Sequence, residues 1–268
     1  MIREPAVSGR FYPSDPGELK VSVKGYLGAG SGENSPATGV IVPHAGYTFS
    51  GPTAGKVFGG VRVPDSVIIL GPNHYGAGPD ISVMAEGTWA MPGFESVIDS
   101  ALAYKILDAC PGAAEDFSAH LQEHSIEVQL PFIHYSNPAA KFLPVSILSL
   151  SREELGELAS AIASAVKDSS GDVLIAASSD MSHYVSPSEA RRLDMLAVDK
   201  IRELDAEGLL ETVRGEGISM CGVLPAAVMI MAAGELGAEE GRLVDYSTSG
   251  DALPGSKEVV GYAGVEIL

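Results

Sequence analysis

Two short apolar runs limit the folds that are open to this chain. Residues 67–70 and 173–177 are entirely aliphatic, and neither run contains a polar residue. A strand with one wet face alternates apolar and polar residues, whereas a strand covered on both faces does not. Both runs therefore predict central strands of a sheet that lies between two layers of helices.

The rest of the chain alternates strand patterns with amphipathic helical patterns. Predicted strands cover residues 39–42, 66–70, 142–148, 173–177, 243–246 and 259–267. Predicted helices cover residues 15–27, 95–109, 125–135, 152–167, 187–204 and 224–236. This order is typical of a layered α/β protein, a sheet flanked by helices. The loop 28–38, rich in small and polar residues, separates a helix from a strand, so we expect a single domain over residues 1–268.

Charge and missing motifs exclude several functions. Among 268 residues, 17 are Lys or Arg and 35 are Asp or Glu, for a net charge of −18. This balance repels nucleic-acid phosphates and anionic lipids, so we expect neither nucleic acid nor a membrane as a partner. The sequence has no G-x-S-x-G elbow, Walker loop or G-x-G-x-x-G, and dinucleotide or ATP chemistry is not expected.

The ends and the cysteines indicate a cytoplasmic protein. Residues 1–10 have no apolar stretch of the kind found in secretory signals. The longest apolar run, 222–234, is shorter than the roughly 20 residues that cross a bilayer. The two cysteines, Cys110 and Cys221, are too few for a disulfide framework, so we expect reduced thiols.

Three histidines follow the ends of predicted strands. His44, His74 and His183 each come within six positions of an apolar strand pattern. If those strands are parallel neighbours, the three side chains reach the carboxyl edge of the sheet, where open α/β folds bind ligands. One such histidine alone would be interpreted as a polar residue satisfied by its neighbours. Three in the same position indicate a metal site or a proton relay.

Cys221 is a fourth candidate, because it stands just before the helix predicted from residue 224. A thiol at a helix N-terminus has a lowered pKa, which suits metal ligation or nucleophilic attack. The alternative is a small buried apolar residue, and the spacing does not separate the two. For Cys110, at the end of a helical pattern, only the buried interpretation applies.

Two further residues have open alternatives. Ser125 is placed to cap the helix predicted over 125–135, which leaves His124 near its start, directed either into the crevice or to solvent. Tyr47, three positions after His44, donates a hydrogen bond either to a substrate or to a buried backbone carbonyl. We take His124 and Tyr47 as candidate substrate contacts.

The motifs together resemble those of the Memo family, whose archaeal and bacterial members are also called AmmeMemoRadiSam system protein B. The similarity begins with REPA and GRFY within residues 3–12 and continues with PHAGY at 43–47, GPNH at 71–74 and EHSIE at 123–127. It resumes with SSD and SH within 178–183, CG at 221–222 and YAG at 262–264. The resemblance therefore covers nearly the whole chain.

The resemblance implies a fold similar to that of class III extradiol dioxygenases, where two histidines and a glutamate hold ferrous iron and another histidine acts as acid and base. By similarity, His44 and His74 take the histidine-ligand positions and His183 the acid–base position or a fourth ligand position. Cys221 stands where the dioxygenases have a carboxylate ligand. This difference in the ligand set distinguishes the chain from the ring-cleaving enzymes. We expect iron or copper, with zinc as the alternative, since His2Cys is a softer ligand set. Asp180 would orient His183 or raise its basicity in a proton shuttle.

These expectations lead to one main hypothesis and two alternatives. The main hypothesis is a metalloprotein that performs redox chemistry on an unknown small molecule. The first alternative is a module that binds a peptide or partner in the same crevice without chemistry; animal members of the family are discussed as phosphotyrosine adaptors, yet no basic cluster flanks the motifs. The family name also implies association with an AMMECR-type protein and a radical S-adenosylmethionine enzyme.

Overall fold

The computed structural model describes residues 1–32 and 34–268, so one position of the predicted loop 28–38 lies outside the described residues. Within these residues the strands form two sheets. The larger sheet has the order β10-β12-β2-β9-β3-β8-β4-β7, with β11 paired to β12, and the smaller one has the order β1-β5-β6. The larger sheet contains β2 (Gly39–Val42), β3 (Ser66–Pro72), β4 (Ile81–Val83), β7 (Ala113–Glu115), β8 (Lys141–Ile147), β9 (Val173–Ser178), β10 (His183–Val185), β11 (Gly241–Thr248) and β12 (Val259–Ile267). The smaller one contains β1 (Ile2–Arg3), β5 (Thr88–Met91) and β6 (Phe94–Val97).

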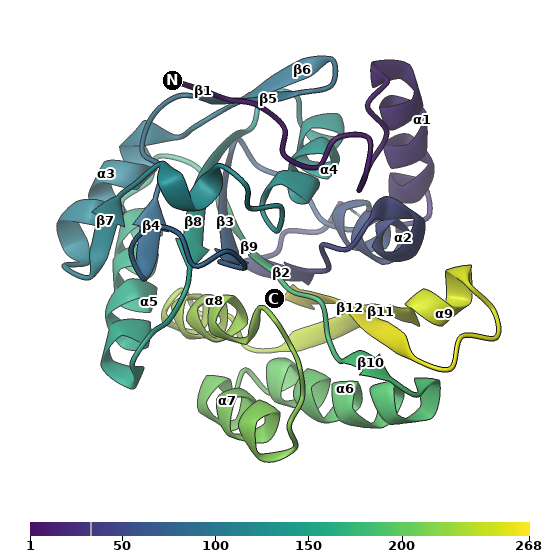
Figure 1. Cartoon of the computed structure of the whole chain (residues 1–268). Helices are drawn as coiled ribbons and strands as arrows, with labels where there is room; N and C mark the ends of the chain where they lie inside the picture. The colour runs from purple at the N-terminus through teal and green to yellow at the C-terminus, as the bar shows by residue number, and fades with distance from the viewer. Residues whose placement is uncertain (33) are drawn as a thin grey trace.

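Helices cover both faces of the larger sheet, as Figure 1 shows. One face carries α1 (Pro16–Leu27), α2 (Tyr47–Phe58) and α4 (Leu130–Ser136). The other carries α3 (Ser100–Ala109), α5 (Arg152–Lys167), α6 (Pro187–Arg202), α7 (Ala206–Gly215) and α8 (Val223–Glu235). Short helices η1 (Ser118–His120), η2 (Glu127–Gln129) and α9 (Ser249–Ala252) lie in connections. None of the helices in the described part of the chain has the length and apolar character to cross a membrane.

The side chains of the central strands divide between two apolar cores. Ile68 and Leu70 of β3 belong to the core under α5 and α8, whereas Val67 and Ile69 belong to the core under α1, α2 and α4. All four side chains have no exposed surface. Because successive residues of a strand point to opposite faces, an unalternating apolar run is what two covered faces require. The predicted layered α/β fold is confirmed.

Parallel pairing brings the ends of three strands to one edge. β9 lies between β2 and β3 and is parallel to both, and β3 is also parallel to β8. The segments that follow β2, β3 and β9 therefore leave the sheet at the same carboxyl edge. This arrangement places the candidate residues near one another.

Two predicted helices begin later than the sequence pattern indicated. The helix predicted over 95–109 begins at Ser100, because β6 pairs antiparallel with β5 and the Asp99 side chain caps α3 by accepting from the Leu102 amide. The helix predicted over 125–135 begins at Leu130 and follows the separate turn η2. Ser125 is therefore not its cap, and its hydroxyl donates to the Pro72 carbonyl at 3.1 Å.

The sequence pattern also missed helix α2, which directly follows His44. Its glycines and Pro52 dilute the apolar pattern, yet the glycines allow close packing against α1. A Cβ atom on Gly55 would lie 2.4 Å from the Cβ atom of Tyr26, closer than side chains tolerate. Small residues thus let α1 and α2 approach closely. The same residues weaken the apolar periodicity by which a helix is recognised in a sequence.

Candidate metal centre

His44 is fixed directly after β2. Its amide donates to the Asp180 carboxylate at 2.7 Å, and its side chain is 2% exposed. Helix α2 starts three residues later, and the Tyr47 amide donates to the Phe11 carbonyl at 2.7 Å. The short connection between β2 and α2 leaves the imidazole at the carboxyl edge of the sheet.

His74 stands in a tight turn after β3. The Asn73 side-chain oxygen accepts from the amides of Tyr75 and Gly76 at 3.1 and 2.9 Å, and Gly76 has a φ of +67°. An asparagine that bonds to the backbone just ahead of it, together with a glycine at positive φ, is a local device for reversing the chain. The turn directs His74 back over the sheet edge, where 31% of its side chain is exposed.

Cys221 comes from the other side, immediately before α8. The following Gly222 packs against the end of β9, where a Cβ atom would lie 2.3 Å from the Ser178 carbonyl oxygen. The Gly222 amide donates to the Ser179 hydroxyl at 3.0 Å, and the Asp180 amide points at the Cys221 sulfur at 3.3 Å. Only glycine permits this approach, so the CG motif has a geometric reason.

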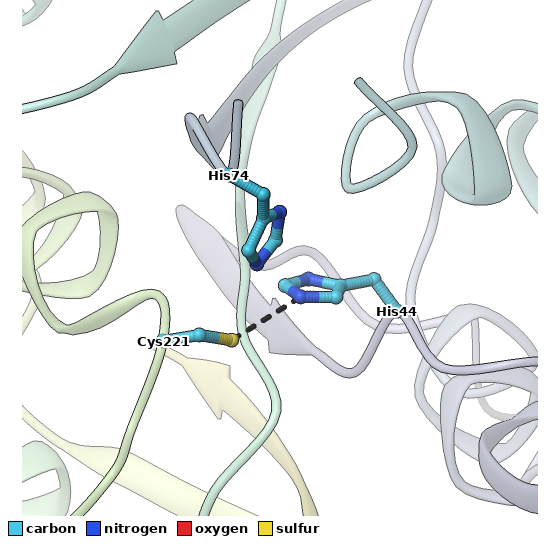
Figure 2. A group of neighbouring side chains, drawn as sticks. All are labelled: His44, His74 and Cys221. Atoms are coloured by element: carbon cyan, nitrogen blue, oxygen red, sulfur yellow. Dashed lines mark hydrogen bonds between the residues drawn. The ribbon is translucent and has the colours of Figure 1, made fainter. Parts of the chain in front are cut away.

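Figure 2 shows how His44, His74 and Cys221 converge. One possible ligand atom from each lies within 4.8 Å of the others. The Cys221 Sγ and His44 Nε2 atoms are 3.2 Å apart, and the two imidazole centroids are separated by 5.3 Å. Two imidazoles and a thiol at this separation are a suitable donor set for a transition-metal ion.

Hydrogen bonds determine which nitrogen of His44 carries the proton. The Ser178 hydroxyl donates to the Ser125 carbonyl at 2.6 Å, so its proton is already used. It accepts from the Gln129 amide at 2.9 Å and lies 2.9 Å from His44 Nδ1. His44 Nδ1 must therefore donate, which leaves the Nε2 lone pair directed toward Cys221. This tautomer is the one that a metal ligand needs.

Glu123 does the same for His74. Its Oε1 atom lies 2.9 Å from His74 Nδ1 and also accepts from the amides of His124 and Ser125, while Oε2 accepts from the His74 amide. A carboxylate can only accept, so His74 Nδ1 donates and Nε2 is left available to an ion. In metal sites, a ligating histidine commonly donates its other ring N–H to a carboxylate in this way.

The electrostatics of the site follow from burial and these hydrogen bonds. Burial, with the neighbouring His124 and His74, holds the pKa of His44 well below its usual value, so His44 is neutral. Burial opposes charge on Glu123, but the His74 hydrogen bond and the backbone amides outweigh it and lower its pKa to about 2. Glu123 in turn raises the pKa of His74 against the opposing effect of burial. Burial, then the charge of Asp180, raises the pKa of Cys221 to about 12, which corrects the expected helix-lowered thiol.

His183 does not belong to this group of three possible ligands. It is half-buried at the start of β10, with Nδ1 2.9 Å from the Ser219 carbonyl and its amide donating to the Ser219 hydroxyl. The Ser219 carbonyl, and not Asp180, therefore orients the His183 ring. The buried Asp180 carboxylate instead accepts from the His44 amide, and burial raises its pKa to about 6.

Tyr47 and His124 have different surroundings. The Tyr47 hydroxyl donates to the Val128 carbonyl at 2.7 Å in the apolar core, so it is not placed to contact a substrate. His124 lies beside the two ligand histidines. Its ring stacks on His74 with centroids 4.8 Å apart and meets the edge of His44 at 5.5 Å.

A second possible ligand group shares His74 and adds Glu123 and His124. Both oxygens of Glu123 already accept backbone hydrogen bonds, and its Oε1 atom also pairs with His74 Nδ1. An ion there would compete with those donors. The group that contains His44 and Cys221 is the better match for a metal ion.

The fold and these side chains define a layered α/β protein with two histidines and a cysteine at the carboxyl edge of its sheet. The chain matches the family model described as Memo-like protein over residues 3–266 and belongs to the Memo family. A MEMO1 family protein of Aquifex aeolicus is 41% identical and one of Methanopyrus kandleri is 39% identical, with 98% or more of each chain covered. The resemblance seen in the sequence is confirmed.

A solved structure shares the fold at much lower identity. The crystal structure of an uncharacterized protein of Escherichia coli K12 matches with a TM-score of 0.57 and 13% identity, over 86% of this chain and 99% of the other. At that identity the match concerns the fold alone.

Several residues that shape the site were missed from the sequence. Glu123, Ser178 and Gln129 fix the ligand histidines through contacts 49 to 134 positions apart in the chain. For Glu123, a signal existed in its place beside His124. Ser178 belongs to the SSD motif, whereas for Gln129 the only signal was a polar residue beside an apolar element.

Proposed function

We propose that His44, His74 and Cys221 hold one transition-metal ion and that the protein carries out redox chemistry on a small substrate there. The observation that carries this proposal is the pair of internal hydrogen bonds at Nδ1 of the two histidines. Both rings are held in the tautomer that leaves Nε2 for an ion. A histidine without a ligand role does not need its Nδ1 proton fixed in this way, and here the arrangement occurs twice at one sheet edge.

The donor set favours a soft or borderline ion. Two imidazoles with one thiolate suit iron, copper or zinc better than the hard ions that prefer oxygen ligands. Such an ion, when bound, supplies Lewis-acid chemistry and, for iron or copper, electron transfer. Because burial raises the pKa of the Cys221 thiol to about 12, metal binding must release its proton. The affinity should therefore rise with pH.

We assign proton transfer to His183 and Asp180, which are not among the proposed metal ligands. The His183 ring donates from Nδ1 to the Ser219 carbonyl, so its Nε2 atom can accept a proton. The Asp180 pKa of about 6 lets its carboxyl group take up or release a proton near neutral pH. We therefore keep His183 and Asp180 as the acid–base groups, acting separately, and His124 as a substrate contact beside the ligands.

The test is metal content after purification without oxygen, for the wild-type protein and for His44→Ala and His74→Ala. Near-stoichiometric iron, copper or zinc in the wild type should fall to a small fraction in both variants, with circular dichroism unchanged. His134→Ala is the matched control, because His134 stacks on Phe94 outside the ligand group. Full retention of metal in both ligand variants would overturn the proposal.

A peptide-binding function is the second candidate. Tyr75 and Tyr184, each directly after a site histidine, are 55% and 75% exposed and offer aromatic surface at the site. A net charge of −18 opposes a phosphorylated peptide. Calorimetry with a tyrosine-phosphorylated peptide separates the candidates, since metal-independent sub-micromolar binding would favour the peptide function.

The partners that the family name implies stay a prediction. We expect an AMMECR-type protein or a radical S-adenosylmethionine enzyme to co-purify with the tagged protein from its native source. Recovery of neither would count against a stable complex.

A further inference from the structure

None of the three proposed metal ligands lies in the N-terminal segment, residues 1–12, which contains the REPA and GRFY motifs. Arg3 in this segment is only 1% exposed. An arginine with so little exposed surface is rare unless its charge and its hydrogen-bond donors are satisfied. Its surroundings are therefore informative.

Arg3 bonds to three points of one distant loop, residues 120–127. Its Nε atom donates to the His120 carbonyl and one terminal nitrogen donates to the Glu123 carbonyl, both at 2.7 Å. The other terminal nitrogen pairs with the Glu127 carboxylate at 2.5 Å. The guanidinium carbon also lies 3.9 Å from the centre of the Trp89 ring. A planar guanidinium can serve all these acceptors at once, and an ammonium group cannot.

Glu127 fastens the same loop to the rest of the segment. Its carboxylate accepts from the amides of Ala6 and Val7 at 2.8 and 3.1 Å and from the Tyr12 hydroxyl at 2.5 Å. Its side chain has no exposed surface. The N-terminal segment and the 120–127 loop are therefore one hydrogen-bonded unit.

This unit is connected by hydrogen bonds to His74, one of the proposed metal ligands. Arg3 holds the backbone carbonyl of Glu123, and the Glu123 side chain holds both the amide and Nδ1 of His74. Two hydrogen-bond steps thus connect a residue at the start of the chain to the tautomer of His74. Displacing the Glu123 backbone would move the carboxylate that keeps the proton on Nδ1.

We propose that Arg3 is a positioning residue for the metal centre, which acts through Glu123 to hold His74 with its Nε2 atom available to an ion. The inference rests on the proposed metal-binding function. It assigns the first motif of the sequence a role at a site that the motif does not reach.

The experiment compares Arg3→Lys with the wild type by two readouts. The lysine keeps a positive charge beside Glu127 but cannot bond to the His120 and Glu123 carbonyls together. Nitrogen-15 NMR of the metal-free protein reports the His74 tautomer, and titration with Zn²⁺ reports affinity. We expect the Nδ1–H population of His74 to fall and the Zn²⁺ dissociation constant to rise about ten-fold, as for lost outer-layer partners of metal sites.

Tyr12→Phe is the matched control, because it removes a buried hydrogen bond to Glu127 and leaves the Arg3 contacts to the loop backbone. It should preserve both the tautomer and the affinity. In a Glu123→Gln background, Arg3→Lys should have no further effect on Zn²⁺ affinity, since the connecting carboxylate is gone. A separate further loss there would contradict an action through Glu123.

An unchanged His74 tautomer and an affinity within two-fold of wild type in Arg3→Lys would overturn the inference. If Arg3→Lys does not fold, the double variant Arg3→Gln with Glu127→Gln removes both charges and is judged by the same readouts. A wild-type protein that binds no Zn²⁺ would contradict the metal centre alone. The tautomer measured without metal would still decide the role of Arg3.

Discussion

Two buried carboxylates beside the metal centre, Glu123 and Asp180, have pKa values shifted in opposite directions. Glu123 accepts four hydrogen bonds, from the His74 ring and from the amides of residues 74, 124 and 125, and its pKa is about 2. Asp180 accepts from the amide of His44 and is aided by that of residue 45, and its pKa is about 6. Since both are buried, the difference comes from the hydrogen bond and charge of His74 at Glu123, together with its backbone donors, which outweigh burial there but not at Asp180.

The difference separates two tasks. Glu123 stays ionised near neutral pH and acts as a fixed support for the His74 ring. Asp180 is close to the point where it gains or loses a proton, so its charge can change during a reaction. Ligand positioning and proton exchange are thus assigned to different carboxylates of one site.

The largest effect is expected from the loss of Arg3, which holds the backbone of Glu123. Arg3→Ala leaves Glu127 as an uncompensated charge in a fully buried position and should lower the free energy of unfolding by about 3–5 kcal/mol. Denaturant titration measures this loss. Arg62→Ala, which breaks an exposed ion pair with Asp172, should cost no more than about 1 kcal/mol. Equal losses in the two variants would contradict the account.

The two carboxylates should give opposite pH dependences of stability. The Glu123 pKa falls from 4.5 to about 2 on folding, so its contribution is present above pH 4.5 and is lost as the pH falls toward 2. The Asp180 pKa rises from 3.8 to about 6, so its contribution is present below pH 3.8 and is lost as the pH rises toward 6. Each shift corresponds to about 3 kcal/mol over its window.

Denaturation of the metal-free protein at several pH values tests this pair of slopes. Subtracting the curve of Glu123→Gln from that of the wild type should leave a stability difference that increases with pH between 2 and 4.5. Subtracting the curve of Asp180→Asn should leave one that decreases between 3.8 and 6. Slopes of the same sign would contradict the distinction between Glu123 and Asp180.

Metal affinity should depend more strongly on Glu123 than on Asp180. Glu123→Gln removes the charge behind the His74 ring and should weaken Zn²⁺ binding by about 10- to 100-fold. Asp180→Asn should weaken it less, because Asp180 bonds to the His44 backbone and not to its ring. Competition titrations with a Zn²⁺ indicator measure both. A larger loss for Asp180→Asn would reverse the assignment.

The smallest effect is expected at Tyr47, which the sequence offered as a substrate contact. Tyr47→Phe removes one buried hydrogen bond to the Val128 carbonyl and should lower stability by about 1 kcal/mol. Metal content should not change. Thermal unfolding and metal analysis of the same sample check both statements, and a loss of metal would show that Tyr47 supports the site.

The sequence predicted what depends on strand ends and missed what depends on distant hydrogen bonds. His44 and His74 could be placed together because each ends an apolar run, and parallel pairing is the usual arrangement of such runs. The ion pair between Arg3 and Glu127 could not be predicted, because the two residues are separated by 124 positions in the chain. Neither residue belongs to a periodic pattern, and a buried ion pair has no local signal.

Local errors in the fold have similar causes. Residues 94–97 continue an amphipathic pattern, yet they pair with β5 across a tight turn, so the helix starts later. Helix α2 was missed because its small residues serve contact with α1. In both places tertiary contacts outweigh the local pattern.

The most direct test of the central claim is the absorption spectrum of the Co²⁺-substituted protein. If Cys221 binds the same ion as His44 and His74, the wild type should show a sulfur-to-cobalt charge-transfer band that Cys221→Ala lacks. Cys110→Ala, which alters the other cysteine in the apolar core, should keep the band. Bound Co²⁺ without the band in the wild type, or a band that survives in Cys221→Ala, would contradict the account.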